Sequence, residues 1–284
     1  MQLAPIVVFS YKRLHHLKKT IESLKKNILS KDSDLIIFSD GPKNDEEKEN
    51  IIKIRKFIVK IQGFKSIKVH EQERNIGLAN SVINGVNKVL LNYDRIIVLE
   101  DDIHTSKFFL KFMNESLKVY DKERYVMSIS GYKYPLKMPK NYKEDVFLFE
   151  RPSSWGWGIW KNRWEEIDFN ISEKHEIFHN KSLKKKLDSG GKDIYKMLVN
   201  YIKGKSDSWA VRYALAHSIN KKYALFPKHS LIHNIGNDGS GTHKGVSSFW
   251  DAEIKDDFDP KVSIVKYDSS IKWRSNRYEK YIHF

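Results

Sequence analysis

The segment from Arg95 to Asp102 places a short apolar run directly before three consecutive carboxylates, Glu100, Asp101 and Asp102. A continuous run of branched apolar residues is typical of a strand buried on both faces, as in a parallel sheet. In open α/β sheets, ligands bind just beyond the carboxyl ends of such strands. We therefore expect a cluster of three negative charges at the edge of a buried sheet, where a ligand would sit.

The three acids need compensation, because adjacent carboxylates repel one another unless a cation or hydrogen-bond donors lie nearby. Hard divalent ions prefer oxygen ligands, and Mg²⁺ is typically held by one or two carboxylates together with substrate phosphates. A plainer interpretation is that Thr105 or Ser106 caps a helix beginning near Lys107 and that the acids interact with its dipole. This segment alone leaves both interpretations open.

Apolar runs and helical periodicity alternate through the first 120 residues. The expected strands are 6–10, 34 to about 40, 66–69 and 95–99, and the expected helices are about 14–26, 46–62, 78–91 and 108–120. This alternation predicts an α/β fold with a mixed, mainly parallel Rossmann-like sheet flanked by helices. No G-x-G-x-x-G follows the first strand and no Walker A sequence occurs, which argues against a dehydrogenase-type fold and a P-loop NTPase.

The pattern changes after about residue 125, where strands become short and aromatic residues cluster. We expect residues 1–125 to form one half of a domain and residues 126–246 to form a second half packed against it. Residues 247–284 form a C-terminal tail in which basic residues accompany Trp273 and other aromatics. Such a tail can dock on an acidic membrane surface, or it can pack back on the body of the protein.

The net charge of +15 indicates an anionic partner such as nucleic acid, acidic lipid or a phosphorylated substrate. Lysine runs such as 184–186 are equally typical of a solvated basic surface, and no zinc-finger or RRM signature occurs, so we expect no nucleic-acid partner. The absence of cysteine fits a reducing cytoplasm. The run from Ile6 to Phe9 is too short for a signal peptide or a membrane span. We therefore expect a cytoplasmic protein, with peripheral contact at the inner membrane face.

Two further strand ends should lie beside the acidic segment. Ser10 and Arg13 follow the first strand, and Asp40 follows the second. An acid there can accept a hydrogen bond from a base or ribose, and an arginine can clamp a carboxylate or phosphate, although Asp-Gly-Pro is also a turn sequence by itself. In Asn75-Ile76-Gly77 the glycine permits close approach, and the next helix N-terminus could face a phosphate or sugar, or simply begin the helix.

Three segments in the second half combine ligand-binding and structural possibilities. Trp155, Gly156 and Trp157 belong to a run in which indoles could stack on sugars or form a core corner. Asp207 precedes an expected helix, where it could cap the helix or act as a general base. The glycine-rich loop up to His243 could be a lid over phosphates with the imidazole reaching a metal, or a long surface loop.

Taken in order, these segments resemble a GT-A-fold glycosyltransferase over about residues 4–245. Residues 5–13, the helix end 21–24 and residues 75–79 resemble bacterial family 2 enzymes. The Glu-Asp-Asp motif, with Arg13 and the Ser-Asp end of the second strand, resembles the eukaryotic N-acetylglucosaminyltransferase I group. The Ser-Trp-Gly-Trp segment and the glycine-rich loop resemble bacterial surface-polysaccharide glycosyltransferases.

The resemblance implies a role for each half and for particular residues. Residues 1–125 would bind the nucleotide sugar and 126–246 the acceptor. Asp102 would coordinate Mn²⁺ or Mg²⁺ at the donor diphosphate, with His243 as a further candidate ligand. The implied donor-binding residues are Ser10, Arg13, Asp40, Asn75, Gly77, Glu100 and Asp101, and the implied acceptor-binding residues are Trp155, Gly156 and Trp157.

Asp207 occupies the position at which the N-acetylglucosaminyltransferase group carries its base. That group has Asp-Asp-Trp, whereas this chain has Asp207-Ser208-Trp209, so serine stands directly before the tryptophan. The implied reaction is a metal-dependent, inverting transfer of a sugar from a nucleotide-sugar donor, UDP-linked in the favoured case. The implied acceptor is a bacterial surface glycan, free or lipid-linked.

Two alternatives remain at this point. A sugar-nucleotide nucleotidyltransferase shares a similar sheet but needs a glycine-rich basic loop after the first strand, and residues 10–14 contain no glycine. A non-enzymatic basic module that binds nucleic acid or membrane is the second alternative, and steeply salt-dependent binding would favour it.

Overall fold

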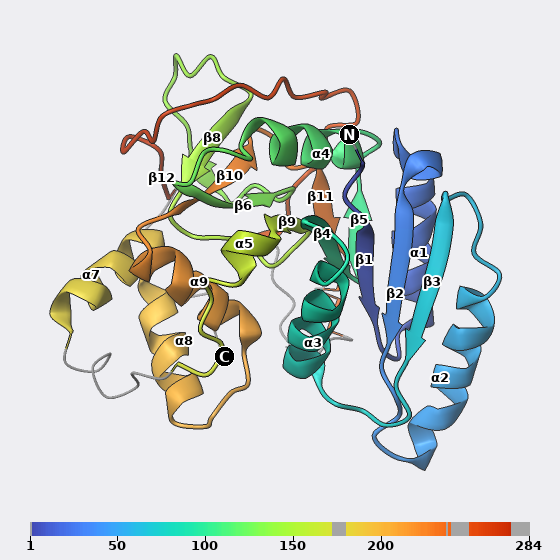
Figure 1. The fold of residues 1–284 in the computed structure, drawn as a ribbon. Helices are drawn as coiled ribbons and strands as arrows, with labels where there is room; N and C mark the ends of the chain where they lie inside the picture. The colour runs from blue at the N-terminus through green and yellow to red at the C-terminus, as the bar shows by residue number, and fades with distance from the viewer. Residues whose placement is uncertain (1, 172–179, 237, 240–249, 274–284) are drawn as a thin grey trace.

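The computed structural model describes residues 2–171, 180–236, 238–239 and 250–273 (Figure 1). Its main sheet has eight strands in the order β3-β2-β1-β4-β9-β6-β10-β8. The pairs β3–β2, β2–β1, β1–β4 and β6–β10 are parallel, and β4–β9, β9–β6 and β10–β8 are antiparallel. The predicted α/β class with a mixed, mainly parallel sheet is confirmed.

The four predicted strands and four predicted helices of the first half agree with the structure to within a few residues, whereas the short β5 and η1 were not predicted. The strands of this half are β1 (Ile6–Ser10), β2 (Asp34–Ser39), β3 (Ser66–Glu71), β4 (Arg95–Glu100) and β5 (Ile103–Thr105), and its helices are α1 (Leu14–Lys25), η1 (Ser30–Asp32), α2 (Asp45–Ile58), α3 (Leu78–Leu90) and α4 (Phe109–Val119). Helix α4 begins slightly later than expected, and the Ser106 hydroxyl accepts a hydrogen bond from the Phe108 N–H at 3.2 Å.

The second half carries shorter strands. These are β6 (Val126–Ser130), β7 (Leu136–Lys137), β8 (Val146–Phe149), β9 (Trp157–Trp160), β10 (Tyr223–Pro227), β11 (Ile232–Asn234) and β12 (Lys272–Trp273). Its helices are α5 (Lys161–Trp164), α7 (Lys181–Gly190), α8 (Lys192–Ile202) and α9 (Trp209–Ile219). Within the described part of the chain, no helix combines the length and apolar character that crossing a bilayer requires.

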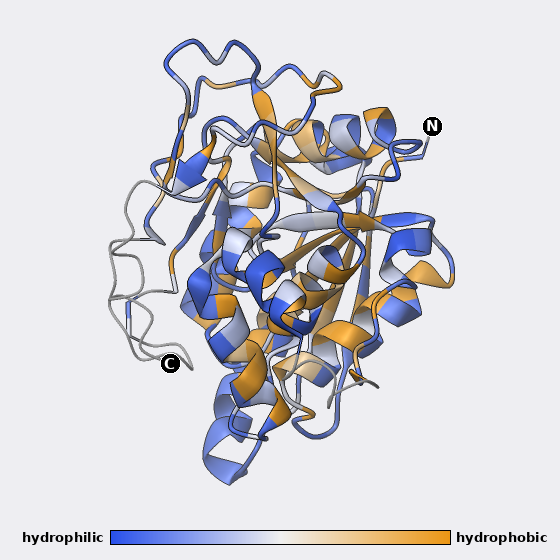
Figure 2. Cartoon of the chain, turned by 90° about the vertical axis from the view of Figure 1, so that its left-hand side faces the viewer, coloured by the Kyte–Doolittle hydropathy of each residue, from blue (hydrophilic) through white to orange (hydrophobic). Residues whose placement is uncertain are grey.

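Strands β1, β2 and β4 bury side chains on both faces, which explains their continuous apolar sequences. In β1, Ile6 and Val8 pack in one core with α1 and α4, while Val7 and Phe9 pack in the other core with α3 and α9. Alternate side chains of a strand point to opposite faces, so a strand covered on both sides needs apolar residues throughout. Figure 2 shows the interior strands mainly orange and the outer loops mainly blue.

The two predicted halves share one continuous sheet. Strand β9 lies antiparallel between β4 of the first half and β6 of the second, with Val98 opposite Trp157 and Ser130 opposite the same residue. Helices α7, α8 and α9 form a separate small core around Leu187 and Leu198. In Figure 1 this helical layer lies at the lower left, away from β1, β2 and β3.

The described C-terminal segment, 250–273, packs on the body of the protein. The Tyr120 hydroxyl donates to the Ser263 carbonyl oxygen at 2.7 Å and accepts from the Val265 N–H at 3.0 Å. Strand β12 pairs antiparallel with β7. Of the two expectations for the tail, packing on the body is therefore the one that these residues follow.

A buried histidine links α9 to the sheet. The ring of His217 has its Nδ1 2.9 Å from the Tyr213 carbonyl oxygen and its Nε2 2.8 Å from the Ser128 hydroxyl. A carbonyl oxygen can only accept, so Nδ1 carries the proton, Nε2 accepts from the serine and the ring is neutral. Burial lowers the pKa of His217 to about 4.

Acidification should destabilise the protein through His217. The ordinary pKa of 6.5 lies above the folded value of about 4, so between these pH values the unfolded chain binds more protons. The free energy of unfolding therefore decreases as the pH decreases through this range, by about 1.4 kcal/mol per pH unit. Since glutamine does not titrate, the stability advantage of the wild type over His217→Gln should shrink between pH 7.5 and 4.5 in urea unfolding. A pH-independent difference would contradict this assignment.

Candidate donor site at the carboxyl edge of the sheet

The carboxyl ends of β1, β2 and β4 meet at one edge of the sheet, as the sequence predicted. The register places Phe9 opposite Glu100 and Ser10 opposite Ser39. Asp101 follows Glu100 directly, and its carboxylate lies 3.4 Å from the backbone nitrogen of Tyr11 in the loop after β1. The acidic motif therefore lies beside the ends of the two neighbouring strands.

Arg13 compensates part of the acidic charge. Its Nη2 lies 2.6 Å from Asp101 Oδ1 and 2.6 Å from Asp102 Oδ2, and both carboxylates are buried. Arg13 is the residue before α1, and α1 also holds the motif through Thr20, whose hydroxyl donates to the Asp101 carbonyl oxygen at 2.7 Å. A charge-assisted contact from one guanidinium to two carboxylates fixes their relative orientation.

Burial strongly affects how these acids hold protons. Burial, with the charges of Asp102 and Asp101, raises the pKa of Glu100 to about 8. Burial also raises the pKa of Asp101 to about 6, although Arg13 acts in the opposite direction. Burial opposes the charge of Arg13 as well, but the two aspartates outweigh it and raise the guanidinium pKa. Arg13 alone therefore does not offset the burial and mutual repulsion of these acids, and an additional cation would favour their ionised forms.

Asp102 offers one oxygen for such a cation. Its Oδ1 is buried and has no hydrogen-bond partner among the described residues, while Oδ2 is paired with Arg13. In the part of the chain that the structure describes, no three His, Asp or Glu side chains converge to hold a metal, and His243 lies outside that part. The residues present thus fit a divalent ion that Asp102 would hold with one oxygen and that phosphates of a ligand would hold with the rest.

Gly236 packs directly against the Asp102 carboxylate. A Cβ at this position would lie 2.1 Å from Asp102 Oδ2 and 2.9 Å from Arg13 Nη1, so only glycine fits. The Ile235 N–H donates to the Asp102 carbonyl oxygen at 2.9 Å. Ile235 and Gly236, which directly follow β11, therefore lie against Asp102.

Asp40 holds the loop before α3. Its Oδ1 accepts from the backbone N–H of Gly41 at 2.9 Å and of Ile76 at 3.1 Å. Its Oδ2 accepts from the Asn75 side-chain amide at 2.9 Å and from the Ser81 hydroxyl at 3.4 Å. Four internal donors occupy the acceptor sites of this carboxylate, so a nucleobase N–H would share or replace one of them.

Three other predicted donor residues lie near this loop or at the strand ends. Asn75 links Asp40 to Gly77, whose N–H donates to the Asn75 side-chain oxygen at 3.2 Å. Gly77 has φ +81° at the start of α3, with open space where a Cβ would stand. The hydroxyls of Ser10 and Ser39 are buried and have no partner among the described residues.

Asp207 lies on the surface just before α9. Its side chain is 66% exposed and its Oδ1 lies 3.0 Å from Nη2 of Arg212. The helix cap is Ser208, whose hydroxyl accepts from the Val211 N–H, so Asp207 itself is not the cap. Trp209 packs against Trp157, which places the start of α9 beside β9.

The predicted acceptor residues have different environments. Trp155 is half-buried, and its ring packs edge-on against Tyr132 with centroids 4.8 Å apart. Gly156 is buried at φ +55°, and its carbonyl oxygen accepts from the Gly131 N–H at 2.7 Å. Trp157 is 1% exposed and lies in the core, which leaves it no face to offer to a sugar.

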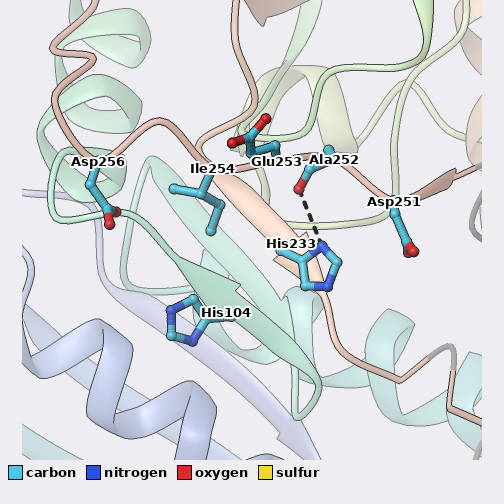
Figure 3. A pocket seen from close by; sticks show the side chains of 7 residues that line it. All are labelled: His104, His233, Asp251, Ala252, Glu253, Ile254 and Asp256. Carbon is cyan, nitrogen blue, oxygen red and sulfur yellow. Dashed lines mark hydrogen bonds between the residues drawn. The ribbon is translucent and has the colours of Figure 1, made fainter.

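A pocket of about 420 Å³ lies beside the β5–β11 ribbon (Figure 3). His104 and His233 are cross-strand neighbours on this ribbon, and residues 251–256 pass over them. The His233 Nδ1 lies 3.2 Å from the Ala252 carbonyl oxygen, which ties the C-terminal segment to β11.

A family model described as "Glycosyl transferase family 2" matches residues 6–189. The chain belongs to this family. Membership in this glycosyltransferase family, with the mixed sheet described above, confirms the GT-A fold that the sequence resemblance implied, and it argues against the nucleotidyltransferase and non-enzymatic alternatives.

Two solved structures are similar to this family 2 glycosyltransferase over part of its length. The crystal structure of S. aureus TarS is 14% identical, covering 54% of this chain and 26% of that chain, with a TM-score of 0.35. The mannosyltransferase PcManGT from Pyrobaculum calidifontis, in complex with GDP-Man and Mn²⁺, is 11% identical, covering 47% and 36%, with a TM-score of 0.33. The chain thus spans about a quarter and about a third of those two proteins. No curated protein matches it.

Two residues that contact the candidate site were not predicted from the sequence. Gly236 was part of a glycine-rich loop but was not connected with Asp102. Glu47 accepts hydrogen bonds from Tyr11 and, at 2.8 Å, from Lys12, and so joins the loop after β1 to the start of α2. Neither contact has a sequence signal beyond the glycine itself, because both join segments that are distant along the chain.

Replacing Arg13 by alanine should destabilise the protein more at pH 8 than at pH 5. The variant leaves buried carboxylates unpaired, which typically costs roughly 3–5 kcal/mol. At the lower pH these acids can take up protons, which relieves the penalty. Urea unfolding at both pH values measures the effect.

Lys12→Ala provides the matched control. Lys12 lies in the same loop and also forms an ion pair, but it is 46% exposed, so its loss should cost less than about 1 kcal/mol. Equal losses in the two variants, or a loss for Arg13→Ala that does not depend on pH, would contradict the proposed clamp.

Proposed function

We propose that this family 2 enzyme transfers a sugar from a UDP-linked donor to a bacterial surface glycan, with a divalent metal ion and inversion at the anomeric carbon. The observation that carries the proposal is the buried, partnerless Oδ1 of Asp102 within an acidic cluster at the carboxyl edge of the sheet. Ligands of open α/β sheets bind at this edge.

The geometry at that edge supports a role for each proposed donor residue. Asp102 would hold Mn²⁺ or Mg²⁺, which when bound supplies positive charge to the leaving diphosphate. Arg13 orients Asp101 and Asp102, and both ion pairs use Nη2, so Nη1 and Nε stay outside those pairs. Glu100 and Asp101 would face the nucleoside and sugar, and Asp40 would meet the base.

Further residues near this edge would contribute to donor or metal binding. Ser10 contributes a buried hydroxyl at the end of β1. Asn75 and Gly77 shape the start of α3, whose N-terminal backbone N–H groups favour an anionic ligand. His243 remains a candidate metal ligand from the sequence.

The acceptor residues would act on the other side of the reacting carbon. Asp207 would remove the proton from the acceptor hydroxyl, whose oxygen then attacks the anomeric carbon opposite the leaving diphosphate. Arg212 holds this carboxylate through an ion pair. The Arg212 guanidinium is itself kept in place by hydrogen bonds to the Phe169 carbonyl oxygen, at 3.2 Å, and to the Tyr201 hydroxyl. Trp155 and Gly156 would line the acceptor path, with Trp157 as the core support behind them.

We further propose that the acceptor is lipid-linked and that the enzyme works at the inner face of the cytoplasmic membrane. The net charge of +15 supports contact with acidic lipid. The described C-terminal segment packs on the body of the protein and carries six acids against four lysines, so this contact would use another part of the surface.

Replacing Asp102 by asparagine should remove the metal dependence of donor binding. UDP-, GDP-, CMP- and dTDP-sugars are titrated by calorimetry with and without Mn²⁺. The wild type should bind the UDP-sugar at least about tenfold more tightly with the metal, equivalent to about 1.4 kcal/mol. The variant should bind it equally well in both conditions, because an amide oxygen is a weaker ligand for a hard cation.

The matched control is Asp101→Asn, which removes the other ion pair of Arg13 but leaves Asp102 Oδ1 in place. It should retain the response to Mn²⁺. A full Mn²⁺ response in Asp102→Asn would contradict the assigned metal ligand, and no nucleotide binding in the wild type would contradict the proposed donor.

Replacing Asp207 by asparagine should slow transfer about 10²–10⁴-fold, the usual contribution of a general base. Donor affinity should stay unchanged, since Asp207 acts on the acceptor. Transfer to a panel of p-nitrophenyl glycosides and UDP-sugar titration measure the two properties separately. Asp259→Asn, at another exposed and ion-paired carboxylate, is the control; transfer at the wild-type rate in Asp207→Asn would rule out this base.

A further inference from the structure

Helices α7 and α8 and the loop that follows them carry an excess of positive charge. Residues 181–205 include eight lysines and two aspartates, and all eight lysines are exposed. One of the aspartates, Asp193, is buried in an ion pair, and the other, Asp188, is paired with a lysine one turn earlier in α7. This stretch therefore presents a strongly basic surface.

The lysines of α8 lie on one face of the helix. Lys192, Lys196 and Lys203, which directly follows the helix, are separated by four and seven residues, a spacing that places side chains on the same side of a helix. The buried Ile194 and Leu198 face the small core that α8 shares with α7 and α9. The three lysines therefore point away from the body of the protein.

Helix α7 has a similar outward face. Lys181 and Lys185 are exposed and four residues apart, whereas the leucines of α7 are buried in the same small core. Lys184 lies on the side toward α8, with its Nζ 5.3 Å from the ring centroid of Tyr195. In Figure 1 the two helices lie at the lower left edge of the molecule. We name their outward lysines the lysine face: Lys181, Lys185, Lys192, Lys196 and Lys203.

Apolar side chains accompany the lysines of α8. Tyr195, Val199 and Ile202 are half-buried and recur at helical spacing beside Lys192 and Lys196. A helix that combines basic and apolar side chains at its surface is typical of binding to an acidic bilayer, where lysines meet the headgroups and apolar groups enter the interface. A soluble polyanion offers no apolar layer, so this combination favours lipid.

Helix α2, at the right in Figure 1, differs in its charge. Residues 45–71, from α2 to β3, include seven basic and five acidic residues. Two lysines of α2 also pair with acids one turn away, Lys48 with Asp45 and Lys53 with Glu49. Interspersed charges of opposite sign reduce the attraction to an acidic surface. The positive charge is therefore more concentrated on α7 and α8 than on this layer.

The lysine face continues into the loop that carries the proposed base. Residues 203–207 are all exposed, and Gly204 turns the chain at φ +70°. The Tyr201 hydroxyl, at the end of α8, accepts a hydrogen bond from Arg212 Nη1 at 3.3 Å, and Nη2 of Arg212 lies 3.0 Å from Asp207 Oδ1. Arg212 therefore holds the end of α8 and the Asp207 carboxylate close together.

We propose that the lysine face docks the protein on an acidic lipid bilayer and thereby holds the 203–207 loop, with Asp207, at the headgroup layer. The inference rests on the proposed function, because it takes the acceptor to be lipid-linked and Asp207 to be the base. Lysines within a Debye length of an acidic bilayer are attracted to it, and their contributions accumulate. A lipid-linked acceptor would then meet Asp207 without leaving the bilayer surface.

Co-sedimentation of the intact chain with vesicles tests the docking surface. The vesicles contain either phosphatidylcholine alone or equal parts of phosphatidylcholine and phosphatidylglycerol, at low and at high salt. The lysine-face variant combines Lys181→Gln, Lys185→Gln, Lys196→Gln and Lys203→Gln. The matched control makes the same change of charge at exposed lysines of the layer from α2 to β3: Lys56→Gln, Lys60→Gln, Lys65→Gln and Lys68→Gln. Thermal unfolding checks that both variants are folded.

The wild type should bind the acidic vesicles at least about tenfold more tightly than the neutral ones, and high salt should weaken this binding. The lysine-face variant should lose at least about tenfold in affinity for the acidic vesicles, and the control should keep most of it. Equal losses in the two variants would overturn the inference, because net charge alone would then explain the binding. Full binding by the folded lysine-face variant, or equal binding of the wild type to both kinds of vesicle, would overturn it as well.

Two parallel titrations separate the remaining outcomes. Binding to a short DNA duplex that the lysine-face variant loses, without binding to acidic vesicles, would assign the surface to nucleic acid and overturn the inference. A titration of the UDP-sugar with Mn²⁺ tests the donor independently. Nucleotide binding without vesicle binding overturns this inference and leaves the donor assignment intact, whereas vesicle binding without nucleotide binding contradicts the proposed donor alone.

Discussion

The contact of Arg13 with Asp101 and Asp102 is the interaction on which the candidate donor site depends. Three acids at the end of a buried strand would repel one another and favour protonation, and one guanidinium sets which of their oxygens are compensated. Since Arg13 immediately precedes α1, the same residue couples the first crossover of the sheet to the acidic motif. Because Arg13 pairs with Oδ2 of Asp102, Oδ1 is left without a partner among the described residues and could bind a cation.

Much of the fold follows from sequence pattern. The apolar runs of the first four strands and the helical periodicity between them fix a parallel sheet, because a strand buried on both faces cannot alternate. The meeting of Ser10, Asp40 and the acidic motif at one edge also follows, since parallel strands end on the same side. These inferences need only local periodicity and the right-handed crossover rule.

The parts that could not be predicted depend on packing between distant segments. A tryptophan among glycines does not reveal which face it occupies, so Trp157 was expected at the acceptor and lies in the core. Asp40 has the sequence of a ligand-binding strand end, but its four internal donors come from loops fixed only by the tertiary fold. Asp207 preceded an expected helix, yet Ser208 supplies the cap.

The insertion of β9 between β4 and β6 has a consequence for how this enzyme could change its substrate. Because β9 pairs with both β4 and β6, the separation between the acids at the end of β4 and the aromatic residues of the second half is set by strand spacing and not by an interdomain hinge. Changes in the loops of the second half could then alter what the protein binds without altering this distance. The sheet therefore keeps the acidic motif and the aromatic residues of the second half at a constant separation.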